Sequence, residues 1–196
     1  MHTCGMRHSQ LANVPEDEES FEELWAAFES LPDQYTRRPL DVLDVAALIR
    51  QECEARGVDC DSLKLQKLCY FVQGAALAEF RTPAFEDRIE AWVHGPVVRK
   101  VWSATRRDAR PDRLAEALGD YNVARNDEVA LKAVNHVINQ LGHWSGSQLR
   151  ELAHNQQPWV EARRGLTPTQ GSDRTIPLTD MLEFFSEQSM IPAGDD

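Results

Sequence analysis

The segment that most constrains the fold is residues 62–80, SLKLQKLCYFVQGAALAEF. Ser62 is a suitable opening residue for a helix, and the apolar residues that follow recur at helical spacing. One face is formed by Leu65, Leu68, Cys69, Val72 and Ala76. The helix is apolar over a wide arc, and such a helix is stable only when other elements cover it. We therefore expect it to be the central helix of a largely helical body.

Helical patterns continue through most of the chain after residue 40. Asp41 or Asp44 can cap a helix that runs through Glu54 and ends at Gly57. Asn126 begins a second one, DEVALKAVNHVINQLG, whose apolar face is Ala130, Ala133, Val134, Val137, Ile138 and Leu141. Shorter helices are predicted around residues 114–118, after a Ser145–Gln148 capping box, from Pro158, and after a Thr179 cap.

One segment has the periodicity of a strand. In RIEAWVHG, Ile89, Ala91 and Val93 alternate with Glu90, Trp92 and His94, which predicts a strand with these two sets on opposite faces. Gly95-Pro96 is expected to end the strand, with Pro96 in the first turn of a following helix. Residues 175–178 could form a brief edge strand. The body is thus predicted to be mostly helical with a strand or two.

Residues 1–40 differ from this body. From Pro15 to Asp33 the chain has eight acidic residues and no Lys or Arg. Within this stretch, SFEELWAAFESL has an aromatic and apolar stripe at helical spacing: Phe21, Leu24, Trp25, Phe28 and Leu31. Two interpretations remain open. The helix either docks on the body and covers its core, or it is a detachable arm that offers its stripe to a groove of another protein.

Composition bounds the function. A chain of 196 residues suffices for one domain, or one domain and an arm. The net charge of −11 argues against nucleic-acid binding, which requires clustered cations. No stretch is long and apolar enough to span a membrane, and the polar start lacks a secretion signal, so we expect a cytoplasmic protein. The four cysteines have no metal-binding spacing, so no metal site is expected.

Catalytic sequence motifs are absent, including the glycine-rich phosphate loops and H-E-x-x-H. The polar residues that stand out within apolar segments are Lys64, Lys67, His94, His154 and Arg163. Together they could bind an acidic group or act as acid and base near neutral pH. Alternatively, the histidines hydrogen-bond chain ends while the lysines lie along the surface with their stems buried.

A basic segment lies between Val97 and Arg113, with six Lys or Arg against Asp108 and Asp112. Three interpretations are open: a solvated face, a landing place for a phosphate or an acidic partner, and a patch that attracts the acidic residues of the arm.

The order of the motifs resembles a known family. A helix with DVA is followed by KLQKLCYFVQGAALA, PAFEDRIEAWVHGPVV, the run LRELAHNQQPWVEAR, and a final strand and helix containing FF. This pattern, from about Leu40 to Gln188, resembles the Panacea antitoxin domain, the family that includes SocA-like proteins. The resemblance implies a mainly α fold: a compact helical domain over 41–190 with a small antiparallel β element. The acidic helical arm of 1–40 lies outside it.

The resemblance also implies a function. Family members are non-enzymatic antitoxins, without a cofactor, that neutralise a toxin encoded nearby; some of those toxins are translation inhibitors similar to alarmone synthetases. The matching positions are Lys64, Lys67, Trp92, His94, Gly95, Pro96, Val97, His154, Pro158, Trp159 and Arg163. We expect Trp92, Gly95, Pro96, Pro158 and Trp159 to be mainly structural. We expect toxin binding by Phe21, Leu24, Trp25 and Phe28 of the arm together with Lys64, Lys67, His94, His154 and Arg163.

Two alternatives remain. Some SocA-like members are described as adaptors that deliver a toxin to a ClpXP-type protease, which would make a protease unfoldase a second partner. An unrecognised enzyme built on Lys64, His94 and His154 is the other. Some family members carry a DNA-binding helix-turn-helix, but nothing in this sequence resembles one.

Overall fold

The structure is a computed structural model, and it describes residues 37–106 and 117–188. Helix α2 (Val42–Ala55) begins after Asp41, whose side chain accepts a hydrogen bond from the Leu43 amide. The helix ends before Gly57, which has a φ of +65°, so the predicted stop is confirmed. Its apolar face, from Val42 to Cys53, is buried.

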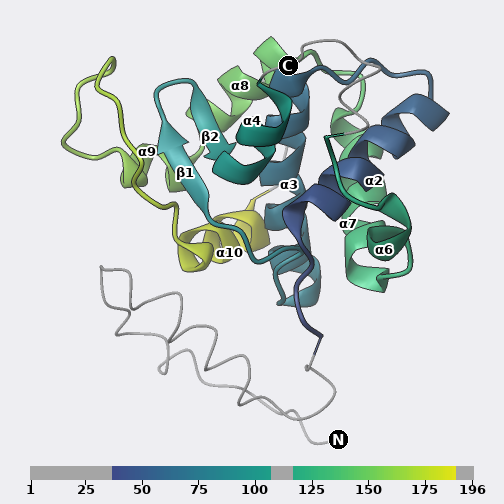
Figure 1. Cartoon of the computed structure of the whole chain (residues 1–196). Coiled ribbons are helices and arrows are strands. Elements are labelled where there is room, and N and C mark those ends of the chain that lie inside the picture. The colour runs from purple at the N-terminus through teal and green to yellow at the C-terminus, as the bar shows by residue number, and fades with distance from the viewer. Residues whose placement is uncertain (1–36, 107–116, 189–196) are drawn as a thin grey trace, which may run out of the picture. The chain divides into compact units, whose positions relative to one another are not determined.

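Helix α3 (Ser62–Phe80) lies in the middle of this body, as predicted (Figure 1). The Asp61 side chain caps it by accepting from the Lys64 amide. Every residue from Lys64 to Leu77 is buried, so the helix is covered on all sides. Gly74 leaves room for the ring of Phe185, which packs so closely that a methyl group at Gly74 would collide with it.

The strand prediction was right for residues 89–92 and wrong for Pro96. Strand β1 (Ile89–Trp92) pairs antiparallel with β2 (Gly95–Val98), and Trp92 lies opposite Gly95. Pro96 therefore belongs to a strand, and helix α4 (Arg99–Thr105) begins only after Val98. The hairpin prevails because the backbone of residues 95–98 finds partners in β1 and in side chains of α3.

The expected edge strand at residues 175–178 is reduced to a single bridge between Glu90 and Thr175. Two backbone hydrogen bonds of 2.8 Å hold it, from Ala91 to Arg174 and from Ile176 to Ile89. This bridge brings the loop before the last helix beside β1.

The remaining helices pack on α3 or on its neighbours. They are α6 (Tyr121–Arg125), α7 (Glu128–Leu141), α8 (Gly146–His154), α9 (Gln157–Ala162) and α10 (Leu178–Glu187). The predicted apolar face of α7 and the Ser145–Gln148 capping box before α8 are both confirmed. The predicted Thr179 cap is wrong, because α10 begins after Pro177 and Thr179 lies in its first turn.

Two details of the helix predictions differ or stay open. The cap of α7 is Asp127 and not Asn126, because the Asp127 carboxylate accepts from the Ala130 amide. Helix α6 was not predicted. The short helix predicted around residues 114–118 lies mostly outside the described residues.

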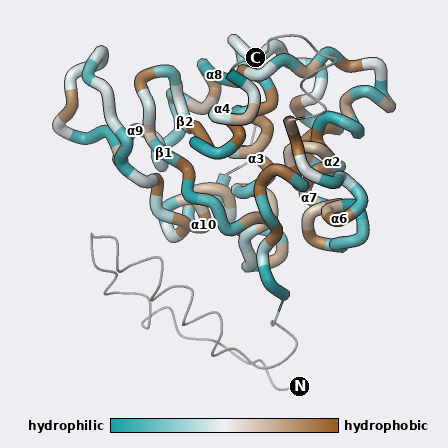
Figure 2. The backbone as a smooth tube through the Cα atoms, in the orientation of Figure 1, coloured by the Kyte–Doolittle hydropathy of each residue, from teal (hydrophilic) through white to brown (hydrophobic). Residues whose placement is uncertain are grey.

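The fold class is mainly helical with one small antiparallel sheet, as expected. Buried apolar residues of α2, α3, the hairpin, α7, α8 and α10 form one continuous cluster. The helices around α3 alternate between hydrophobic and hydrophilic residues, as Figure 2 shows, and the hydrophobic ones supply this cluster.

Candidate functional site

The candidate site is built around the β1–β2 hairpin, whose turn is Val93–His94. Gly95 has a φ of +98°, a backbone conformation that glycine adopts readily and other residues rarely. The side chain of Gln66 on α3 fixes the far end of β2: its Oε1 accepts from the Val98 amide at 3.0 Å. The hairpin is therefore tied to the central helix, and the exposed His94 is held at its tip.

Lys67 holds the middle of β2 from within the core. Its side chain has no exposed area, and its Nζ donates to the carbonyl oxygen of Pro96 at 2.8 Å. Burial lowers the pKa of Lys67 to about 7, and the nearby charge of Arg150 acts in the same direction. The amine can thus exchange a proton near neutral pH while remaining inside the fold.

His154 reaches the same turn from the end of α8. Its ring stacks on Trp159, with the ring centroids 4.2 Å apart and the planes 9° from parallel. Its Nε2 is buried and, within the part of the chain that the structure describes, has no hydrogen-bond partner. Burial and then the Lys67 amine lower the pKa of His154. A methyl group on Gly95 would lie 2.7 Å from the Lys67 Nζ and 3.2 Å from the His154 Nε2.

Trp159 and Arg163 hold β1 through its backbone carbonyls. The Trp159 Nε1 donates to the Trp92 carbonyl at 3.0 Å. The Arg163 guanidinium donates to the Ala91 carbonyl at 2.9 Å and to the Gln170 carbonyl at 2.7 Å. Arg163 also lies over the Trp159 ring, 5.3 Å from its centroid. These side chains therefore secure the strand and the loop after α9 together.

The structure brings four of the predicted body residues to the hairpin: Lys67, His94, His154 and Arg163. Lys64 lies elsewhere, because its Nζ donates to the Gly142 carbonyl after α7 at 2.6 Å. The alternative in which the lysines lie along the surface is wrong, since Lys64 is only 6% exposed and Lys67 is fully buried. The arm residues Phe21, Leu24, Trp25 and Phe28 lie outside the described residues.

The residues that we expected to be structural also lie at this site. Gly95 and Pro96 form the start of β2, and Pro158 is buried in the first turn of α9. Trp159 packs against the core cluster. Trp92 behaves differently from Trp159, since its indole ring packs against Trp102 of α4.

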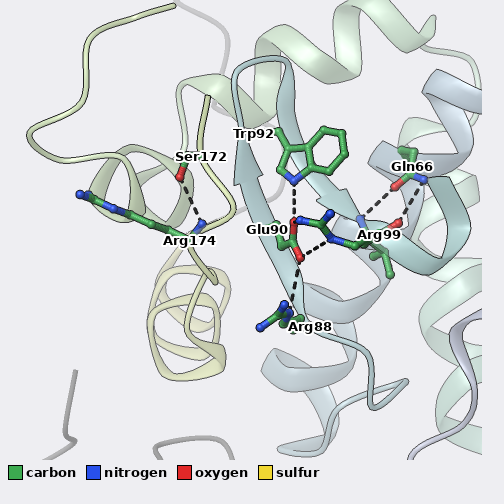
Figure 3. Close-up of polar contacts among 8 residues, drawn as sticks. Gln66, Arg88, Glu90, Trp92, Arg99, Ser172 and Arg174 are labelled. Carbon is green, nitrogen blue, oxygen red and sulfur yellow. Dashed lines mark hydrogen bonds and ion pairs between the residues drawn. The ribbon is translucent and has the colours of Figure 1, made fainter. Parts of the chain in front are cut away.

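Sequence reasoning missed Glu90. Alternation along β1 gave it a different face from Ile89 and Ala91, yet all three are buried. The Glu90 carboxylate accepts from Trp92 Nε1 at 2.7 Å and from Arg99 at 2.8 and 3.0 Å, and Arg88 forms an ion pair with it (Figure 3). The sequence did hold one signal for a buried Glu90, since Arg88 and Arg99 both lie within ten residues of it. A buried carboxylate needs such partners.

The arrangement favours holding a surface in a fixed shape. Most polar groups of the cluster hydrogen-bond backbone carbonyls of the hairpin and its neighbouring loops. Within residues 37–106 and 117–188, no group of three His, Cys, Asp or Glu side chains is placed to hold a metal ion. In the same residues, no helix is long and apolar enough to cross a membrane.

Comparison with known proteins finds a resemblance to antitoxins. Residues 65–160, from α3 into α9, match the family model for "Antitoxin SocA-like, Panacea domain". This stretch includes Lys67, the whole hairpin, His154 and Trp159. Together with the relative described next, the match shows that this chain resembles the SocA-like Panacea antitoxin domains.

One protein to which the chain is similar is Antitoxin SocA of Caulobacter vibrioides (strain NA1000 / CB15N). The two are 28% identical over 168 residues, which cover 79% of this chain and 89% of SocA. No solved structure matches the chain. These two matches support an antitoxin role for this chain.

Proposed function

We propose that this chain is an antitoxin that neutralises a cognate toxin, encoded nearby, by direct protein–protein binding. The observation that carries the proposal is the match of residues 65–160 to SocA-like Panacea antitoxins, supported by the likeness to Antitoxin SocA over most of both chains. Binding suits the hairpin cluster, because its buried polar groups fix backbone positions and hold one exposed turn in place.

In the body, the residue that we assign to toxin contact is His94, which is exposed at the tip of the hairpin. Lys67, His154 and Arg163 are buried or half-buried and surround this turn, so they act by positioning it. Lys64 supports the same surface at a distance, by anchoring α3 to the end of α7.

The arm supplies a second contact in this proposal. Phe21, Leu24, Trp25 and Phe28 give apolar area, and the eight carboxylates around them favour association with a basic surface. A toxin that holds nucleotide or tRNA has such a surface, and a translation inhibitor similar to an alarmone synthetase is one example.

Co-expression tests the proposal. The chain is expressed with the product of the adjacent reading frame, with a tag on one of the two, and growth and co-elution are measured. We expect growth to be rescued and the two proteins to elute together. Rescue without a complex contradicts direct binding and favours delivery to a protease or chemical reversal of the toxin. No rescue contradicts the antitoxin role.

Two variants locate the contacts. We expect His94→Ala to weaken the complex about fivefold, the effect of removing one side chain at an interface of moderate energy. His136→Ala, on the exposed face of α7, is the matched control and should leave affinity unchanged. Deletion of residues 1–38 should also weaken binding. Full affinity without these residues contradicts the role of the arm.

A further inference from the structure

Two tryptophans pack against each other at the surface. The rings of Trp92 on β1 and Trp102 on α4 are 5.1 Å apart between centroids and meet edge to face at 65°. Both are half-buried. Among the described residues, Trp144 and Trp159 pack against the hydrophobic core, whereas Trp92 and Trp102 are not part of that packing. A pair of indoles thus leaves apolar area at the surface that contributes little to the core.

An arginine lies over each indole. The Arg99 guanidinium is 5.5 Å from the Trp92 ring centroid, and the Arg106 guanidinium is 4.7 Å from that of Trp102. We call these four residues the indole–guanidinium patch. Arg99 forms an ion pair with the buried carboxylate of Glu90, which also pairs with Arg88. Arg106 is exposed, and in the part of the chain that the structure describes its side chain contacts no carboxylate. A guanidinium stacked on a ring keeps its N–H donors free at the edge.

A hollow of about 380 Å³ adjoins the patch, between the hairpin and α4. Three cations line it, and their side chains are substantially exposed: Arg88 at 51%, Arg99 at 51% and Lys100 at 41%. Its acidic lining residues are more buried, Glu90 completely and Asp87 at 20%. The residues that line the hollow therefore present mainly positive charge to solvent, although the whole chain carries a net charge of −11. Lys100 is already paired with Asp41, whose side chain is as exposed as that of Lys100, so Arg88 and Arg99 supply most of this positive charge.

We propose that the indole–guanidinium patch and this hollow form a docking surface for an acidic segment of the toxin that carries an aromatic or other apolar side chain. The apolar side chain packs on the two indoles, while the carboxylates pair with Arg106 and with the cations of the hollow. The assignment of this acidic segment to the toxin rests on the proposed function. Single-stranded RNA also stacks on aromatic side chains beside arginines, but the net charge opposes a polyanion.

A peptide titration tests the surface without the toxin. The full chain, with ¹⁵N in its tryptophan indoles, is titrated with a short peptide that has glutamates on both sides of one phenylalanine. We expect the indole signals of Trp92 and Trp102 to shift and those of Trp144 and Trp159 to stay in place. A peptide with lysines in place of the glutamates should cause no shift.

Three results of this titration overturn the proposal. They are equal shifts of all indoles, no shift with the acidic peptide, and a shift caused only by a single-stranded RNA oligonucleotide of random sequence.

The toxin complex supplies the second test. Arg106→Glu reverses one exposed charge of the patch and should weaken the complex at least about fivefold. Trp102→Ala should weaken it by a similar factor, since it removes the apolar half of the contact. Lys132→Glu, on the exposed face of α7, is the matched charge reversal and should bind like the unchanged protein. Unchanged affinity of both patch variants overturns the proposal. If the unchanged chain binds no adjacent product, the proposed function fails, and the peptide titration still decides the surface.

Discussion

The hairpin is held by single residues whose polar groups are unfavourable to bury. On burial the Lys67 amine loses its hydration and gains one hydrogen bond, to the Pro96 carbonyl. The Nε2 of His154 is buried nearby. Gly95 makes this arrangement possible, because any side chain at that position would occupy the space between the amine and the imidazole. The stability of the fold therefore depends on the protonation of a lysine and on the absence of one methyl group.

The Lys67 pKa predicts how stability changes with pH. The unfolded chain keeps the ordinary lysine pKa of 10.5, and the folded value is about 7, so between these values only the unfolded state holds the proton. The free energy of unfolding should therefore rise with pH across this window, by up to about 1.4 kcal/mol per pH unit from this group. Below pH 7 both states are protonated and this contribution stays constant.

Urea unfolding between pH 7 and 10 checks this in the unchanged protein and in Lys67→Met. The variant loses the hydrogen bond to the Pro96 carbonyl, which lowers its free energy of unfolding by the same amount at every pH. Its free energy of unfolding should also lack the additional rise with pH that Lys67 causes. Burial and the Lys67 amine hold the pKa of His154 below its ordinary value of 6.5, so His154 does not titrate within the window. Equal slopes for both proteins would contradict the buried, deprotonated lysine.

Gly95→Ala should destabilise the protein by about 2 kcal/mol or more, because alanine is strained at a φ of +98° and its methyl group would press on Lys67 and His154. Gly171→Ala is the control, since that glycine has open space around it. Denaturation midpoints measure both. A Gly95→Ala midpoint equal to that of the control would show that the turn can relax without cost.

The central helix organises its neighbours through polar side chains as well as apolar ones. Lys64 binds the chain after α7, and Gln66 and Lys67 bind β2. Gln73 accepts from the amide of Ala84 at 2.9 Å and donates to the Phe85 carbonyl at 3.0 Å. Each of these bonds satisfies backbone groups of a segment that would otherwise be buried without partners.

Gln73→Ala should therefore lower the free energy of unfolding by about 3 kcal/mol, since buried amides and a carbonyl lose their partners. The backbone amide of Ala84 should also exchange its hydrogen faster. Gln157→Ala, at the exposed start of α9, serves as the control and should change stability by less than about 0.5 kcal/mol. A Gln73 variant as stable as this control would show that water replaces the lost bonds.

Across the whole body from α2 to α10, the buried apolar residues form one cluster. Among the described residues, no helix or strand has a hydrophobic core of its own. A loss of stability in one element should therefore lower the stability of the whole body. We therefore expect this body to unfold in one step, as single domains of this size commonly do.

We expect one cooperative urea transition, with tryptophan fluorescence and far-ultraviolet circular dichroism giving the same midpoint. A Trp25→Phe background removes the arm tryptophan, so that fluorescence reports only on Trp92, Trp102, Trp144 and Trp159. Midpoints that differ between the two probes would reveal a part of the body that unfolds separately.

Much of the helical architecture could be predicted from the sequence. The apolar faces of α3 and α7 and the Ser145–Gln148 capping box depend on spacing within one segment, and local spacing is what a sequence displays directly. The order of five motifs also indicated a resemblance to SocA-like Panacea antitoxins, which the comparisons then confirmed. The boundary between arm and body at residue 40 stays a prediction.

Tertiary structure decided the site. Whether Pro96 lies in a helix or a strand, whether Lys67 lies at the surface or in the core, and whether Glu90 faces solvent all depend on partners from other segments. Lys67 and Pro96 are 29 residues apart, and Gln66 and Val98 are 32 apart. A charged side chain is buried only where such partners satisfy it, and the sequence alone does not show which distant groups the fold will bring together.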